Sequence, residues 1–175
     1  MPQWLTTDPA GLNRRALEHA AKSAIAATIS ILASRLCHLP EAYWAAIASM
    51  VVMQSTLGAS LSISVSRLIG DALGALSGAI LAIAFGSNIY VFGAGVFVLG
   101  LLTAAVHLDR SAFRFAGITM VVVMLIPRPD SPWMVALHRF SEISIGIVIG
   151  LLLVFLWPER PAAPAVTAAA RVKQN

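Results

Sequence analysis

Long apolar segments fill most of this sequence and constrain its fold more than any other feature. Of its 175 residues, 58% are hydrophobic and 11% are charged, whereas an ordinary soluble domain is about half apolar and a quarter charged. So few charged side chains cannot coat a soluble domain of this length. Lipid can solvate the remaining apolar surface if the backbone pairs within helices or a closed barrel. Because the segments are long and do not alternate like barrel strands, we expect an all-α protein embedded in the lipid bilayer.

Six segments approach the length of roughly twenty apolar residues that a membrane-crossing helix needs. They are 16–36, 43–63, 67–86, 89–108, 112–127 and 135–157. Breakers separate them, notably Pro40 and the proline-rich stretch 127–132. We therefore expect a cytoplasmic segment (1–15), a six-helix transmembrane domain (16–158) and a disordered cytoplasmic tail (159–175).

The distribution of basic residues predicts the orientation of these helices. Cytoplasmic loops carry an excess of Lys and Arg. With both termini in the cytoplasm, the basic residues on the inner side are Arg14, Arg15, Lys22, Arg67, Arg110, Arg114, Arg160, Arg171 and Lys173. Those on the outer side are Arg35, Arg128 and Arg139. The start of the chain lacks an apolar core with a cleavage site, so we expect the first helix to direct insertion into a bacterial inner membrane.

Two matches along the chain predict an internal repeat. Adding 72 to Arg67, Gly74 and Gly78 gives Arg139, Gly146 and Gly150, and adding 70 carries the segment 49–52 onto the similar segment 119–122. Three helices repeated twice (about 16–86 and 89–158) must insert in opposite orientations, because each unit has an odd number of crossings. Inverted repeats are typical of several transporter folds, whose sites lie near mid-membrane. The alternative is an old duplication that has retained no transport.

Charged residues recur on one face of the third and sixth segments. Spacings of three and four place Arg67 and Asp71 on one face of a helix, and Arg139 and Glu142 on one face of another. In the predicted topology the arginines lie near opposite membrane surfaces, which would place a positive charge at each mouth of an anion pathway. Asp71 and Glu142 are then candidates for proton coupling. Alternatively, each arginine and its neighbouring carboxylate form a local ion pair, or the arginines reach the interface.

The same faces carry glycines, which let another helix approach closely. We interpret this set mainly as helix-packing positions: Gly70, Gly74, Gly78, Gly146 and Gly150.

The second segment contributes further candidate residues. Its apolar part ends at Met53, and Gln54, Ser55 and Thr56 follow where a span would still be within the membrane. An interrupted helix there could bind a carboxylate, whereas in an ordinary helix the hydroxyls would bond to its own carbonyls. Tyr43 and Trp44 open the segment; an interfacial aromatic belt explains them, and stacking on a substrate is the alternative.

Several function classes find no support in the sequence. The single cysteine, Cys37, and four scattered histidines provide no metal-ligand spacing, so we expect no metal and no cofactor. Nucleophile-elbow, zinc-protease and P-loop motifs are missing, so we expect no enzyme. The basic residues form no cluster or aromatic-interleaved stripe, which argues against nucleic acid as a partner.

The run from Tyr43-Trp44 through Gln54 to Arg67-x-x-Gly70-Asp71-x-x-Gly74 resembles the fusaric acid resistance and aromatic acid exporter superfamily. The resemblance covers about 16–158. It implies six-helix units that export aromatic carboxylic acids, often joined to a soluble cytoplasmic domain. Plant aluminium-activated malate channels are similar more distantly and work as dimers. Asp71 departs from the threonine usual in the family, which places a negative charge beside Arg67 and favours proton coupling.

These features together predict a minimal six-helix unit, assembled as a homodimer, that exports small organic anions. Arg67 and Arg139 would recruit the anion, and Asp71 or Glu142 would carry a proton. A passive anion channel and a non-transporting scaffold or partner subunit are the alternatives.

Overall fold

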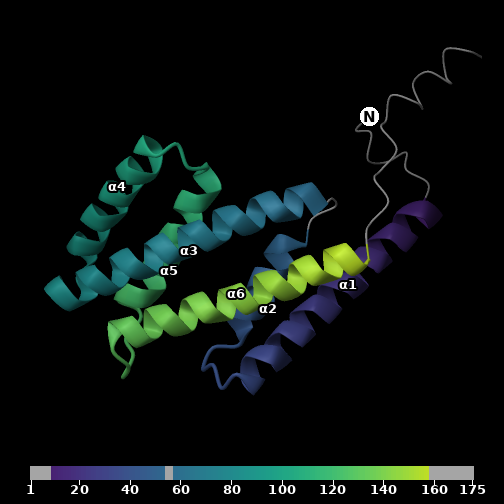
Figure 1. Cartoon of the computed structure of the whole chain (residues 1–175), viewed down its shortest axis with the longest axis horizontal. Helices are drawn as coiled ribbons and strands as arrows, with labels where there is room; N and C mark the ends of the chain where they lie inside the picture. Colours follow the sequence, from purple (N-terminus) through teal and green to yellow (C-terminus); the bar gives the residue numbers. More distant parts are fainter. Residues whose placement is uncertain (1–8, 54–56, 158–175) are drawn as a thin grey trace, which may run out of the picture.

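The computed structural model describes residues 9–53 and 57–157, with side chains from residue 16 onward, and almost all of them are helical. The six helices are α1 (Pro9–Leu36), α2 (Tyr43–Val52), α3 (Leu57–Phe85), α4 (Ile89–Ala105), α5 (Arg110–Leu125) and α6 (Pro132–Leu156) (Figure 1). No strand occurs within the described ranges. The prediction of an all-α protein is confirmed.

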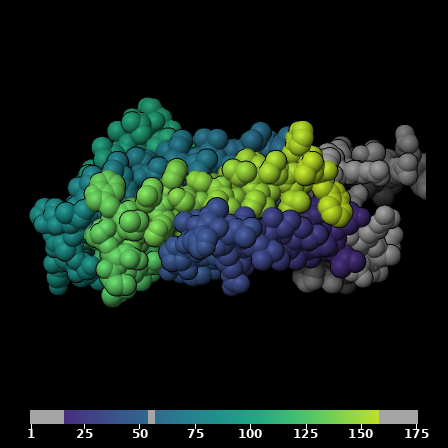
Figure 2. Space-filling view, turned by 60° about the horizontal axis from the view of Figure 1, so that its bottom comes forward, coloured from purple at the N-terminus to yellow at the C-terminus, as the bar shows by residue number. Residues whose placement is uncertain are grey.

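The helices α3 and α6 form the axis of the molecule. They contain 29 and 25 residues and are long and apolar enough to cross a membrane. Figure 1 shows them side by side and running in opposite directions, with α4 standing away from them. In Figure 2, α6 runs along one face with α3 on one side of it and α1 and α2 on the other. These two apolar helices thus provide a frame for the bundle, and α1, with 28 residues, is as long but packs at the side on α2 and α6.

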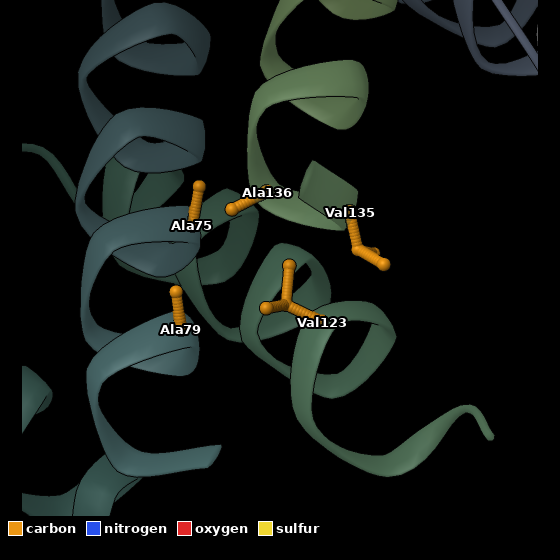
Figure 3. Packing of buried hydrophobic residues seen from close by; sticks show 5 residues of the cluster. All are labelled: Ala75, Ala79, Val123, Val135 and Ala136. Atoms are coloured by element: carbon orange, nitrogen blue, oxygen red, sulfur yellow. The ribbon is translucent and has the colours of Figure 1, made fainter. Parts of the chain in front are cut away.

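Small residues bring these helices close together. Gly74 of α3 lies against the backbone of Ala116 in α5, and Gly146 of α6 lies against that of Ala45 in α2; a Cβ at either glycine would overlap the facing carbonyl oxygen. Gly70 and Gly78 also face α5, and Gly150 faces α2. Between α3, α5 and α6, a buried cluster joins Ala75, Ala79, Val123, Val135 and Ala136 (Figure 3). Narrow side chains therefore line the contacts on which α3 and α6 depend.

The predicted second span, 43–63, is wrong as a single helix. The helix α2 ends at Val52, Met53 is extended, and residues 57–63 form the start of α3 instead. With 10 residues, α2 is only about 15 Å long, and the 16 residues of α5 extend about 24 Å. Both are shorter than the roughly 30 Å hydrocarbon core. The break falls between Val52 and Leu57, around the polar residues that follow Met53, where the sequence allows an interrupted helix as an alternative to a continuous one.

Two other boundaries differ from the prediction or cannot be compared with it. The helix α1 begins at Pro9, within the segment expected to precede the first helix. The predicted disordered tail, 159–175, lies outside the described residues.

The same turn ends α1 and α4. At the end of α1, the amide of His38 donates to Arg35 and that of Leu39 donates to Ser34. At the end of α4, His107 donates to Ala104 and Leu108 donates to Thr103. The φ angles of the two histidines are 56° and 54°, as a Schellman-type helix end requires. Each first helix of a predicted repeat therefore ends in the same way.

Candidate functional site

Four charged side chains are buried in the two long helices. Arg67 is 4% exposed, and Asp71, Arg139 and Glu142 are each 1% exposed. Arg67 and Asp71 come from α3, and Arg139 and Glu142 from α6. Charges inside apolar helices are costly and usually line a pathway or pair with one another. The contacts of each side chain distinguish these two cases.

Arg67 and Asp71 form a pair within α3. Their Nε and Oδ2 atoms lie 3.5 Å apart, one helical turn from each other. The Thr119 hydroxyl of α5 donates a hydrogen bond to the other carboxylate oxygen. The Arg67 guanidinium also lies 4.8 Å from the centre of the Phe115 ring. Arg67 is therefore neutralised locally, as the ion-pair alternative predicted.

Arg139 has a different environment. Its guanidinium carbon lies 3.2 Å from the centre of the Trp44 ring in α2. None of its three guanidinium nitrogens has a hydrogen-bond partner among the described residues. Glu142, the carboxylate one turn away, instead accepts a hydrogen bond of 2.7 Å from the backbone amide of Glu41. The predicted local pair of Arg139 with Glu142 is not formed, and five strong donors remain unused in a buried place.

Of the two arginines, only Arg67 lies within ion-pair distance of Asp71. The charge of Asp71 also acts on Arg139 from beyond that distance, so the groups form one electrostatic cluster where α3 and α6 pack together. This differs from the predicted placement of one arginine at each mouth of a pathway. The reason is the length of α3, which begins at Leu57 rather than at Arg67. Arg67 consequently lies about 15 Å from the start of its helix.

A second ion pair, missed in the sequence, lies beside this cluster. Arg128 in the α5–α6 loop contacts Glu41 in the α1–α2 loop at 2.8 Å. The Trp44 indole donates to the same Glu41 oxygen at 3.1 Å. Burial alone would raise the pKa of Glu41, but hydrogen bonds from Arg128 and Tyr43 outweigh it and hold that pKa below its ordinary value. Glu41 is therefore ionised at neutral pH.

No pattern in the sequence could have singled out this pair. Pro40 and two prolines beside Arg128 mark both segments as loops, but nothing local shows that these loops meet.

The remaining predicted site residues are less central. Tyr43 is 49% exposed, with its ring centre 5.3 Å from that of Trp44. Gln54, Ser55 and Thr56 lie outside the described residues. An apolar groove between α3 and α4 has no charged lining residue and is separate from the cluster; it is lined by Ser77, Ile80, Leu81, Phe85, Val91, Ala94, Gly95, Val98, Leu99 and Leu102.

Long apolar helices with charges buried between them are the features of a helical membrane protein. Comparison with known families agrees: the model of the fusaric acid resistance protein-like family matches residues 27–153, well over half of the chain. The chain belongs to this family. The resemblance expected from the sequence is confirmed.

Curated relatives carry the name "uncharacterized transporter YdhK". The protein of Escherichia coli (strain K12) is 28% identical over 160 residues, covering 86% of this chain and 24% of the relative. That of Salmonella typhimurium (strain LT2) is 24% identical over 163 residues, with the same coverages. The chain thus spans about a quarter of the length of these relatives. No solved structure gives a significant match.

Proposed function

We propose that this chain is a membrane transport unit that exports small organic anions, in particular aromatic carboxylates, across the bacterial inner membrane. The observation that carries the proposal is the Arg139 guanidinium, which is 1% exposed and has no hydrogen-bond partner on any nitrogen within the described part of the chain. A buried arginine without partners costs free energy unless another anion satisfies it. A carboxylate fits its two parallel N–H groups in a bidentate pair.

An aromatic ring lies beside each arginine, which supports an aromatic group in the proposed substrate. Trp44 lies against Arg139 and Phe115 against Arg67. An arginine stacked on a ring keeps its N–H edge free for an anion while the apolar surroundings accommodate an aromatic group. The family, described by resistance to fusaric acid, supports the same substrate class.

We propose Asp71 rather than Glu142 as the proton carrier. Glu142 has a structural partner in the backbone amide of Glu41. Asp71 instead lies where its charge offsets both arginines. Protonation of Asp71 would remove that competing negative charge and leave the arginines free for the incoming anion.

We also propose that 16–86 and 89–158 are inverted repeats. Exchanging the halves converts α1, α2 and α3 into α4, α5 and α6. The extensive packing of α3 on α5 in this exchange corresponds to the extensive packing of α6 on α2. The contact between α3 and α6 corresponds to itself, because each takes the place of the other. The matching turns after α1 and α4 support the same relation. Inverted repeats place both termini on one side of the membrane, and we propose six crossings with that side in the cytoplasm, although α2 and α5 are shorter than the hydrocarbon core. Assembly as a homodimer stays a prediction that a monomeric mass in lipid would contradict.

The test is flux in liposomes that contain the purified protein. We expect uptake of at least one aromatic carboxylate, dependent on a pH gradient, and a loss of about tenfold or more in Arg139→Gln, because a charge-assisted pair is removed. Arg114→Gln removes an exposed charge on α5 and serves as the matched control.

The other outcomes separate the competing functions. Flux that needs no gradient and gives large electrical currents would indicate a passive channel. Undiminished flux in Arg139→Gln would remove the proposed role of this residue. No flux of any anion by a correctly inserted protein would favour a scaffold or partner subunit.

A further inference from the structure

We infer that the Glu41–Arg128 ion pair is the barrier that closes the Arg139 site at the end of the molecule where the α1–α2 and α5–α6 loops meet. The inference rests on the proposed function in treating Arg139 as the binding group. It assigns a role to two residues that the anion pathway does not otherwise include.

The pair is more exposed than Arg139. Its side chains are 17% (Arg128) and 21% (Glu41) exposed, whereas Arg139 is 1% exposed. Three contacts connect the ion pair to Arg139. Arg128 binds Glu41, the Trp44 indole donates to Glu41, and Arg139 stacks on the Trp44 ring. Opening of the ion pair is therefore transmitted to Trp44, the side chain that covers Arg139.

The backbone amide of Glu41 connects the same loop to the buried cluster. It donates to Glu142 of α6 at 2.7 Å. Glu41 thus holds the start of α2 against α6 through its backbone while its side chain holds the α5–α6 loop. Separation of the carboxylate from Arg128 would free one loop without releasing the other contact.

Both loops are built so that the side chains, rather than the backbone, hold them together. Pro40 precedes Glu41, and Arg128 lies between Pro127 and Pro129. Prolines fix the backbone and remove N–H donors. No backbone hydrogen bond joins the two loops in the described ranges. A partly exposed ion pair is weak, so this contact can open without unfolding either loop.

The chemistry of the pair also indicates what opens it. Glu41 presents a carboxylate to Arg128, and an organic anion carries the same group. A carboxylate bound to the guanidinium of Arg139 can therefore exchange with Glu41 on Arg128 as it leaves towards the loops. In this order of events Arg128 makes the last contact with the exported anion, and Glu41 is a positioning residue that competes with it.

The first experiment needs no substrate. In a Cys37→Ser background, which removes an exposed thiol, Thr119→Cys places a reporter beside Asp71. We expect a small membrane-impermeant thiol reagent, added on the side of these loops, to label it slowly. Glu41→Gln or Arg128→Gln should raise the labelling rate about fivefold, the factor equivalent to about 1 kcal/mol. Glutamine keeps an acceptor for the Trp44 indole, so Glu41→Gln tests the charge.

Two controls separate a barrier from general loosening of the fold. The reversed pair, Glu41→Arg with Arg128→Glu, should restore slow labelling, which a merely destabilised protein would not do. Asp130→Asn removes an exposed charge from the same loop and should leave the rate unchanged. A labelling rate that is the same with and without the pair would overturn the inference.

Flux measurements distinguish this inference from the proposed function. In Glu41→Gln we expect anion flux to lose part of its dependence on the pH gradient, because one barrier no longer closes. If no variant carries any anion but labelling still responds to the pair, the barrier stands and the proposed function fails. If flux depends on Arg139 but neither flux nor labelling changes in Glu41→Gln or Arg128→Gln, the proposed function stands and the barrier fails.

Discussion

At the scale of single residues, the two membrane arginines differ although they lie at matching positions of the two halves. Arg67 has a carboxylate of its own helix within 3.5 Å, whereas Arg139 has an aromatic ring and no hydrogen bond within the described residues. Removing one partner of a buried pair leaves the other charge uncompensated. Removing Arg139 breaks no hydrogen bond among the described residues, and Asp71 keeps Arg67 as its ion-pair partner. The two residues therefore predict opposite effects on stability.

Replacement of each arginine by methionine tests this difference. Arg67→Met should lower the free energy of unfolding by about 3 kcal/mol, because Asp71 loses its partner. Arg139→Met should change it by less than about 1 kcal/mol or raise it, because a thioether–ring contact replaces the cation–ring contact. Denaturation of both variants in the same detergent measures the difference. Equal losses in the two variants would contradict the assignment of Arg139 as the unpaired arginine.

At the scale of helices, two short elements pack on two long ones. The helix α5 lies on the glycine face of α3, and α2 lies on that of α6. Backbone contact at these faces leaves no space for even one methyl group. The position of Trp44 over Arg139, and of Thr119 beside Asp71, therefore depends on glycines that carry no chemistry themselves.

Alanine substitutions measure this dependence. Gly74→Ala and Gly146→Ala should each destabilise the protein by about 1–3 kcal/mol, because the added Cβ overlaps a facing backbone oxygen. Gly117→Ala in α5 meets no atom within 4 Å and should be neutral or stabilise the helix by up to about 1 kcal/mol. Thermal unfolding in detergent compares the three variants. A loss in Gly117→Ala as large as in the other two would contradict close packing at Gly74 and Gly146 as the cause, because helix propensity favours alanine at all three positions.

At the scale of the whole molecule, the Glu41–Arg128 contact constrains the topology. It places the α1–α2 and α5–α6 loops at one end of the bundle. Six alternating crossings would put both loops on the outer side, with the α4–α5 connection on the inner side. The excess of basic residues on the opposite side supports that orientation.

Thiol labelling in intact cells tests the orientation. Cys37, exposed in the α1–α2 loop, should react with an impermeant reagent added from outside. Ser111→Cys in a Cys37→Ser background should react only after the cells are opened, because it lies near the start of α5. Ser87→Cys in the α3–α4 connection provides an external positive control. The reverse pattern, or equal reaction at all three positions, would contradict six crossings with cytoplasmic termini.

The sequence by itself determined the class of the protein and the faces on which its charged residues lie. A high apolar content requires lipid or a large core whatever the tertiary arrangement. Spacings of three and four also place Arg67 with Asp71, and Arg139 with Glu142, on one face of any helix that contains them. Both properties are local, so they can be predicted from a single chain.

Only the tertiary structure decided where those faces meet. The end of α2 at Val52 and the early start of α3 moved Arg67 away from a helix end, and the packing of α3 on α6 brought Arg139 within reach of the charge of Asp71. That Glu142 binds the backbone amide of Glu41 rather than Arg139, and that Glu41 reaches Arg128, follow from contacts between segments far apart in the sequence. Such contacts depend on helix lengths and crossing positions that glycine packing sets. Hydrophobic pattern and charge spacing carry no information about them.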